Sequence, residues 1–277
     1  MIQRVNDAQG RPVWLVSGHE RARDLLADPR LGRSHPNPEH PVRLTQPGLF
    51  GGPIPDPEGE QADLHRMRKL LTPSLSARRM ERLRPRVETI VDELLDELGR
   101  SGSPADFHTV VAFPLPALVV CELLGVPAED REDFCRWQIE AKQISKPAVA
   151  RGGLQSLWRY LGTLIERKRW TPSDDVISDL LHAAKLDPKL TDDGIAHLAA
   201  GLLFAGHAPV VAIIDRGVLL LLTHSEQRAA LQRDPALAES ALEEIFRFAS
   251  PIERRRTTRR GGLTRYASVD IEVDGVT

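Results

Sequence analysis

A run of small and unusual residues near the middle of the most apolar segment is the first candidate for chemistry. It reads Ala205-Gly206-His207-Ala208-Pro209. Within a helix, glycine costs about 1 kcal/mol relative to alanine and proline about 3 kcal/mol. Proline also lacks the backbone donor that the helix needs, so we expect the helix to bend or open at Gly206. Opened backbone inside a core can hold a ligand, and a simple packing kink is the alternative.

Charged residues form the second candidate. Glu244 and Arg247 are three positions apart, so on a helix they share one face and can pair. On the surface such a pair contributes a few tenths of a kcal/mol. A buried pair needs further donors to offset its desolvation. From the residues alone, an ordinary solvated pair is favoured.

Basic residues cluster in two places. His65, Arg66, Arg68 and Lys69 could together hold an anion, with a solvated basic face as the alternative that composition favours. The second cluster places five arginines within residues 254–260. No aromatic side chains alternate with them, which argues against binding to single-stranded nucleic acid. A solvated charge cluster is the favoured interpretation there.

Helices are expected to position these groups. Apolar residues recur at helical spacing after Ser76, and Pro85 predicts a break in that helix. Residues 114–124 are apolar nearly all round, which predicts a buried helix. Thr191 is expected to cap the longest helix, extending to about Thr223. Further helices are expected at 19–27, 63–71, 129–142, 153–168, 175–184, 225–233 and 236–248, strands at 11–16, 265–267 and 269–273, and a Pro- and Gly-rich loop at 35–59.

Composition restricts the class of protein. The 277 residues carry a net charge of -2, with 41% hydrophobic and 27% charged residues, which is typical of a soluble globular protein. This charge gives no global attraction to nucleic acid or to an anionic membrane. Asp215 and Arg216 interrupt the most apolar stretch, so it predicts a buried core helix. Cys121 and Cys135 have no metal-binding spacing and are expected to be reduced, buried thiols. No signal peptide or interdomain linker is apparent, so we expect one cytoplasmic domain over residues 1–277.

The order of six segments carries a family resemblance. They are DLHRMRKLLTPSLSARRM, RPRVETIVDELLDEL, PLPALVVCELLGVPAEDREDF, LLFAGH, LEEIFRFASPI and GGLTRYASVDIEVDGVT. In this order the chain resembles a bacterial cytochrome P450 from about residue 11 to 277. The resemblance implies a mainly α fold, a truncated P450-type helical prism with a small β portion. It also implies the lineage of haem-thiolate monooxygenases, which are oxidoreductases acting on a small, secondary-metabolite substrate with electrons from a ferredoxin.

The resemblance also implies roles for individual residues. Arg68 and Arg265 are expected to hold the two haem propionates, because guanidinium groups pair well with carboxylates. Glu244 and Arg247 become the family's buried structural pair. The kink at Gly206 becomes the oxygen-side groove over the haem, and the loop at 35–59 lines the substrate pocket.

The sequence departs from the family pattern at important positions. No cysteine follows Arg247, and neither Cys121 nor Cys135 has a glycine two residues later, so the axial thiolate that drives O–O cleavage is missing. Ala208 and Pro209 replace the usual acid and threonine. Leu64 stands where the family has a histidine, with His65 one place later.

Two hypotheses therefore remain open. In one, the chain is a shortened P450, which the retained Arg68 and Arg265 favour. In the other, it is a haem-free P450-like protein that binds and stabilises a partner enzyme, which Ala208 and Pro209 favour. In either case a partner is expected over the face left bare beyond the Glu-x-x-Arg helix.

Overall fold

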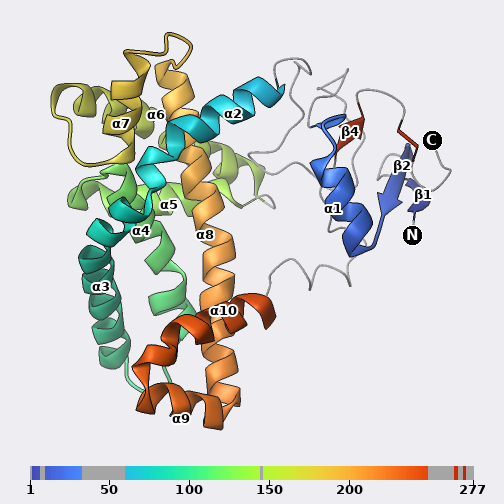
Figure 1. Ribbon diagram of the computed structural model, residues 1–277. Helices are drawn as coiled ribbons and strands as arrows, with labels where there is room; N and C mark the ends of the chain where they lie inside the picture. Colours follow the sequence, from blue (N-terminus) through green and yellow to red (C-terminus); the bar gives the residue numbers. More distant parts are fainter. Residues whose placement is uncertain are drawn as a thin grey trace. The chain divides into compact units, whose positions relative to one another are not determined.

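The computed structural model describes residues 2–6, 10–32, 60–143, 146–248, 265–267 and 271–272. They form two compact units, one of residues Met1–Arg68 with Ile252–Thr277 and one of residues Lys69–Pro251. Helices dominate the described chain, which confirms the prediction of a mainly α protein with a small β portion (Figure 1). The loop expected at 35–59 and the arginine cluster at 254–260 lie outside the described residues.

The first unit contains the strands. β1 (Ile2–Asn6) and β2 (Pro12–Val16) pair in antiparallel register, with Ile2 opposite Val16, and α1 (His19–Ala27) follows. β3 (Leu31–Gly32) pairs with β4 (Tyr266–Ala267), which joins the two ends of the chain in one sheet. The expected β2, α1 and β4 are confirmed, whereas β1 and β3 are polar or short and were not predicted. Ile271 and Glu272, within the strand expected at 269–273, are not in a strand, and the rest of that segment is not described.

The helices of the second unit follow α2 (Glu60–Leu71), which ends before Pro73 as expected. They are α3 (Ala77–Arg100), α4 (Pro114–Leu124), α5 (Arg131–Ala141), α6 (Pro147–Trp170), α7 (Val176–Ala184), α8 (Asp192–Thr223), α9 (Ser225–Arg233) and α10 (Ala238–Phe248). Every predicted helix is present, with ends that differ by a few residues.

The break expected at Pro85 is wrong, because α3 is continuous over 24 residues. Pro85 lies on the exposed face of α3, where water can satisfy the carbonyl that loses its partner. On the opposite side, Ile90 is 2% exposed and belongs to the core. Packing of the apolar stripe therefore outweighs the local preference of one proline.

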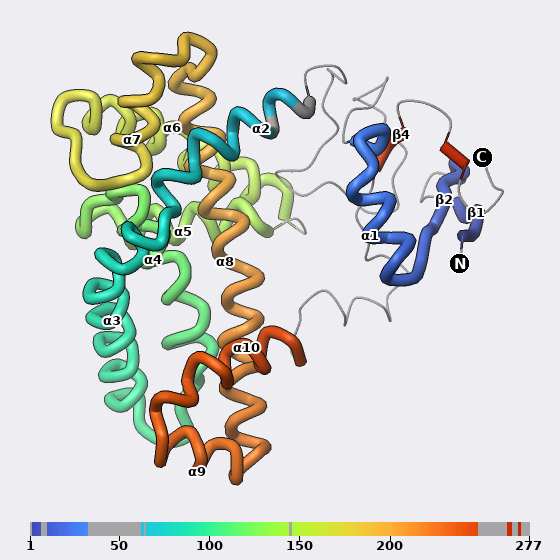
Figure 2. Tube along the Cα trace, viewed as in Figure 1, coloured from blue at the N-terminus to red at the C-terminus, as the bar shows by residue number. Residues whose placement is uncertain are grey.

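α8 passes through the length of the helical unit, with α9 and α10 at one end and α6 and α7 at the other (Figures 1 and 2). It packs against α4, α6, α7 and α10. The side chain of Thr191 accepts a hydrogen bond from the backbone of Gly194, as expected for the cap. α8 is long and apolar enough to cross a membrane, but Ile195 and Leu203 are completely buried against the other helices. The first half of α8 therefore lies in the core as predicted, whereas its second half is less buried, with Leu219 58% and Leu222 61% exposed.

Candidate functional site

The segment Gly206–Pro209 lies within α8, and the helix continues through it without interruption. The expected opening at Gly206 is therefore absent, and the alternative of a bend there stays a prediction. A Cβ at Gly206 would lie 3.3 Å from Cγ2 of Val120 on α4, so this glycine permits close approach of two helices. Close packing of α8 against α4 therefore explains the glycine at position 206. Ala205, Ala208 and Pro209 are exposed, and they form a face of small side chains that carries no acid or hydroxyl.

His207 points the other way and is only 2% exposed. Its Nε2 lies 3.0 Å from the backbone oxygen of Phe113, and its Nδ1 lies 3.2 Å from Nζ of Lys142. The rings of His207 and Phe113 also meet edge to face at 4.8 Å. Burial first, then the charge of Lys142, lowers the pKa of His207 to about 4. His207 is consequently a neutral core residue at pH 7, turned away from the exposed alanines.

The two arginines expected to hold carboxylates belong to the first unit. Arg68 is exposed on α2, and Arg265 is half-buried immediately before β4. His65 is exposed on the same helix as Arg68, and Arg66 pairs with Asp63 at 3.6 Å. On this basic segment, Arg66 is thus half-buried and paired with Asp63, and the side chains of His65 and Arg68 are exposed.

Glu244 and Arg247 pair as their spacing predicts. Nε and Nη2 of Arg247 donate to the two carboxylate oxygens of Glu244 at 2.7 and 2.6 Å. Burial of this pair, expected from the family resemblance, is wrong, since the side chains are 60% and 69% exposed. The reason is that α10 packs on α8 through its apolar side, where Ile245 lies against Gly217, and the paired charges occupy another face.

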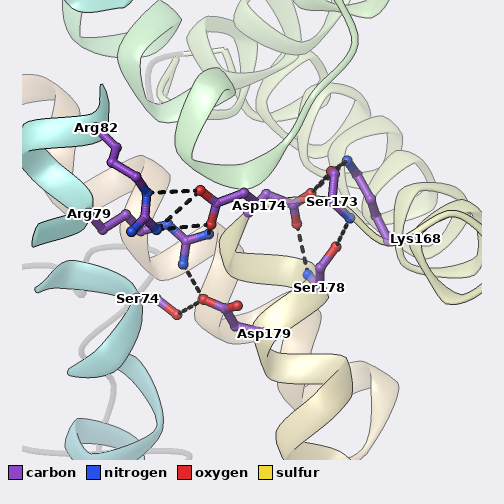
Figure 3. Close-up of polar contacts among 9 residues, drawn as sticks. Ser74, Arg79, Arg82, Lys168, Ser173, Asp174, Ser178 and Asp179 are labelled. Atoms are coloured by element: carbon purple, nitrogen blue, oxygen red, sulfur yellow. Dashed lines mark hydrogen bonds and ion pairs between the residues drawn. The ribbon is translucent and has the colours of Figure 1, made fainter. Parts of the chain in front are cut away.

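A larger polar network, which the sequence did not predict, connects α3 to the start of α7 (Figure 3). The guanidinium of Arg79 is 8% exposed and bridges Asp179 and Asp174, at 2.8 Å for the latter. Ser74, fully buried, donates to Asp179 at 2.6 Å. Arg82 reaches Asp174 at 3.1 Å. Two consecutive aspartates, Asp174 and Asp175, before a predicted helix could have indicated a polar site. They do not indicate that Arg79 is the partner of Asp174.

The same loop continues to a second cluster around Asp175. Lys168 contacts this carboxylate at 2.6 Å, and Asp175 caps α7 by accepting from the backbone of Ser178 at 2.8 Å. Gly125, which ends α4 with a φ of +71°, lies so close that a Cβ would be 2.4 Å from the Asp175 carboxylate. Only glycine suits both this backbone and this approach. The network connects helices that pack around α8, and Lys168 also lines an open pocket of about 440 Å³ beside Leu164.

The residues expected to bind a haem group fit it only in part. Arg68 and Arg265 have the charge that a propionate requires. The axial ligand is the difficulty, because the chain has two cysteines and both lie in α4 and α5. Cys121 is completely buried in α4, and Cys135 is half-buried in α5. These residues therefore do not fit an iron–thiolate bond.

Comparisons with known proteins agree on one family. Pentalenolactone synthase of Streptomyces exfoliatus is 40% identical over 98% of this chain and 67% of its own length. Cytochrome P450 107B1 of Saccharopolyspora erythraea is 34% identical over 98% of this chain and 68% of its own length. The crystal structure of the cytochrome P450 PimD, a pimaricin epoxidase, matches with a TM-score of 0.81 and 36% identity, over 99% of this chain and 69% of that one. No protein-family model matches the chain. The chain spans about two thirds of the length of these relatives.

Proposed function

Because the chain belongs to the cytochrome P450 family, we propose that it derives from haem-dependent monooxygenases of secondary metabolism, and that these 277 residues alone do not ligate iron through cysteine. The observation that carries the proposal is the position of the chain's two cysteines, Cys121 on α4 and Cys135 on α5. Haem proteins of this family need a cysteine thiolate to promote O–O cleavage. Such a ligand would have to come from outside the present residues.

The relatives suggest the class of substrate. One is a pentalenolactone synthase and another a pimaricin epoxidase, so both names refer to the making of small natural products. A small secondary metabolite as substrate, a ferredoxin-type electron donor and a cytoplasmic location belong to the proposal. Arg68 and Arg265 are its propionate-binding residues, supported by their charge and by the exposure of Arg68.

Reconstitution with haemin tests the proposal. The purified chain is mixed with haemin, reduced and exposed to carbon monoxide. We expect no red-shifted Soret band of a thiolate-ligated haem, and we expect Cys121→Ser with Cys135→Ser to leave the spectrum unchanged. Appearance of that band would refute the proposal. The DNA downstream of codon 277 gives a second test, because an in-frame Phe-x-x-Gly and Cys-x-Gly loop would identify the source of the ligand.

A haem-free auxiliary protein is the second candidate, and two observations favour it. Ala208 and Pro209 leave the exposed face of α8 without an acid or a hydroxyl. In addition, large apolar side chains are exposed at the end of α8 and on α10, and we call these the proximal apolar surface: Leu219, Leu222, Leu242, Phe246 and Phe248. An exposed apolar group of this kind is typical of a protein-binding face. Haemin titration separates the candidates, since an auxiliary protein should show no saturable haemin binding and no effect of Arg68→Gln.

A further inference from the structure

The open pocket beside Leu164 lies where α6 ends and the loop to α7 begins. Its volume of about 440 Å³ is within the range of small-molecule sites in proteins. The described residues that line it come from the last two turns of α6, from the loop that follows and from the turn after α4. None of the residues assigned above to haem binding belongs to this lining.

The charged groups of the lining are both cations. Arg167 and Lys168 line the pocket, and no described residue of the lining is an acid. Nη1 of Arg167 donates to Asp130 at 3.0 Å, and Nζ of Lys168 lies 2.6 Å from a carboxylate oxygen of Asp175. These two carboxylates lie outside the lining and hold the cations in place. An anion that enters the pocket therefore meets positive charge at its wall.

The same groups supply hydrogen-bond donors. The ammonium of Lys168 carries three hydrogens, and Oγ of Ser173 accepts one of them at 2.7 Å (Figure 3). The guanidinium of Arg167 carries five N–H groups, of which Asp130 accepts one. Thr171 adds an exposed hydroxyl to the lining. A carboxylate fits this set of donors, because hydrogen bonds between ionised groups are about twice as strong as neutral ones.

Trp170 adds an aromatic side chain to the lining, and it is 80% exposed. Its Nε1 donates to Oε1 of Glu166 at 3.2 Å, which orients the indole. Leu164 is completely buried and gives the pocket an apolar base. Aromatic rings attract one another in offset or edge-to-face contact, so a flat ring against the indole would remove apolar area from water.

We propose that this pocket binds a small planar organic anion, whose ring packs on Trp170 and whose carboxylate is held by Arg167 and Lys168. The two cations repel a cationic ligand, and a purely apolar ligand leaves their donors unused. An inorganic anion alone would use the cations without the indole. The inference goes beyond the proposed function, and its test needs no haem.

Titration with naphthalene-2-carboxylate tests the proposal. The chain contains four tryptophans, and Trp170→Phe identifies the indole N–H signal of Trp170 in an NMR spectrum of isotope-labelled protein. We expect the ligand to shift this signal saturably. Trp14 is the internal control for stacking on an exposed indole beside an arginine, since it is 48% exposed with Arg4 at 6.0 Å, and its signal should not move. The uncharged naphthalene-2-carboxamide should bind about tenfold more weakly, and acetate should give no saturable shift.

Matched variants separate a built site from general attraction. Arg167→Gln should weaken binding of the naphthalene carboxylate by roughly three- to tenfold, measured by calorimetry. Trp170→Ala should weaken it by a similar factor, since it removes the aromatic contact. Arg169→Gln removes the same charge from the same turn of α6, but Arg169 pairs with Asp192 at 2.7 Å and is not part of the lining. Its affinity should equal that of the wild type.

Arg167 is chosen over Lys168 for this test because its side chain is 48% exposed, whereas loss of Lys168 would leave the buried Asp175 without its cation. Circular dichroism shows whether each variant keeps its helices. Equal affinity for the carboxylate and the carboxamide would overturn the proposal. The same conclusion would follow from an equal loss of affinity in the Arg167 and Arg169 variants, or from a Trp170 signal that does not move.

Discussion

Nζ of Lys142 lies 3.2 Å from Nδ1 of His207 inside the helical unit. Since Nε2 of His207 faces the carbonyl oxygen of Phe113 at 3.0 Å, that nitrogen donates its proton and Nδ1 accepts from the ammonium. Burial lowers the pKa of Lys142 to about 8, and burial together with this ammonium lowers the pKa of His207 to about 4. At pH 7 Lys142 is therefore a cation and His207 a neutral ring. Each should make the free energy of unfolding depend on pH, His207 in the acid range and Lys142 in the alkaline range.

The first prediction concerns the acid range. The pKa of His207 is about 4 when folded and near 6.5 when unfolded, so between these values the unfolded chain binds more protons. The free energy of unfolding should therefore fall as pH drops from 6.5 to 4, by roughly 2–3 kcal/mol at most from this residue. Urea denaturation of the wild type and of His207→Gln at several pH values measures the difference. His197→Gln, an exposed histidine on the same helix, is the control, and an identical acid slope in all three proteins would contradict the assignment.

The second prediction concerns Lys142. Its pKa is lowered on folding, so the wild type should become more stable as pH rises from about 8 to 10.5, and Lys142→Met should lack that gain. The variant should also be more stable at pH 7 and should raise the pKa of His207, although burial keeps that pKa below 6.5. NMR titration of the imidazole measures the shift. Lys146→Met, exposed at the start of α6, should change neither quantity, and an unmoved His207 titration in Lys142→Met would disprove the coupling.

The third prediction concerns the Arg79 network. Arg79→Ala removes the cation that bridges Asp174 and Asp179, which then keep only Arg82 and Ser74 as respective partners, so we expect a loss of about 1.5–3 kcal/mol in the free energy of unfolding. Arg79→Lys should recover only part of it, because an ammonium cannot reproduce the fork that bridges Asp174 and Asp179. Arg84→Ala removes an exposed pair with Glu81 on the same helix and should have no measurable effect. Equal effects of the Arg79 and Arg84 variants would show that the network is not structural.

Local patterns in the sequence predicted the helices but not their contacts. The cap at Thr191 and the apolar spacing of α3 depend on neighbours within a few residues, so the sequence shows them directly. Arg79 also lies on a predictable helix, yet its partners Asp174 and Asp179 are distant in the chain and depend on how the helices pack. For the same reason the Glu244–Arg247 pairing was predictable and its exposure was not. At Pro85 the local pattern was misleading. The general preference of proline against a helix interior predicted a break, but packing of the apolar stripe keeps α3 continuous.

The fourth prediction concerns Pro209, which is exposed in the middle of α8 and cannot donate to the carbonyl of Ala205. Pro209→Ala restores that donor in a helix that is already continuous. The variant should be more stable, by an amount approaching the roughly 3 kcal/mol that proline costs in a helix interior. Pro85→Ala, at an exposed site in α3, is the matched control and should also stabilise. Chemical denaturation decides the matter, and a destabilised Pro209→Ala would mean that the proline is required by packing.

The last prediction concerns the proximal apolar surface. Single exposed apolar residues are normal, but here Leu219 and Leu222 share one face of α8, and Leu242 and Phe246 share one face of α10. Leu222 is 61% and Phe246 47% exposed. Because α8 and α10 pack together, we expect these faces to form one apolar surface through which copies of the chain associate. The apparent mass of the isolated chain should then rise with concentration.

Sedimentation across a concentration series measures this association, and Leu222→Gln with Phe246→Ser should shift it toward monomer. Trp170→Ser removes an even more exposed apolar side chain from α6 and serves as the control, because it lies outside the proximal apolar surface. Its association should equal that of the wild type. A wild-type chain that stays monomeric at every concentration would remove the main physical support for a protein partner on this face. It would show that burying this apolar surface against another protein chain gives too little free energy to drive association.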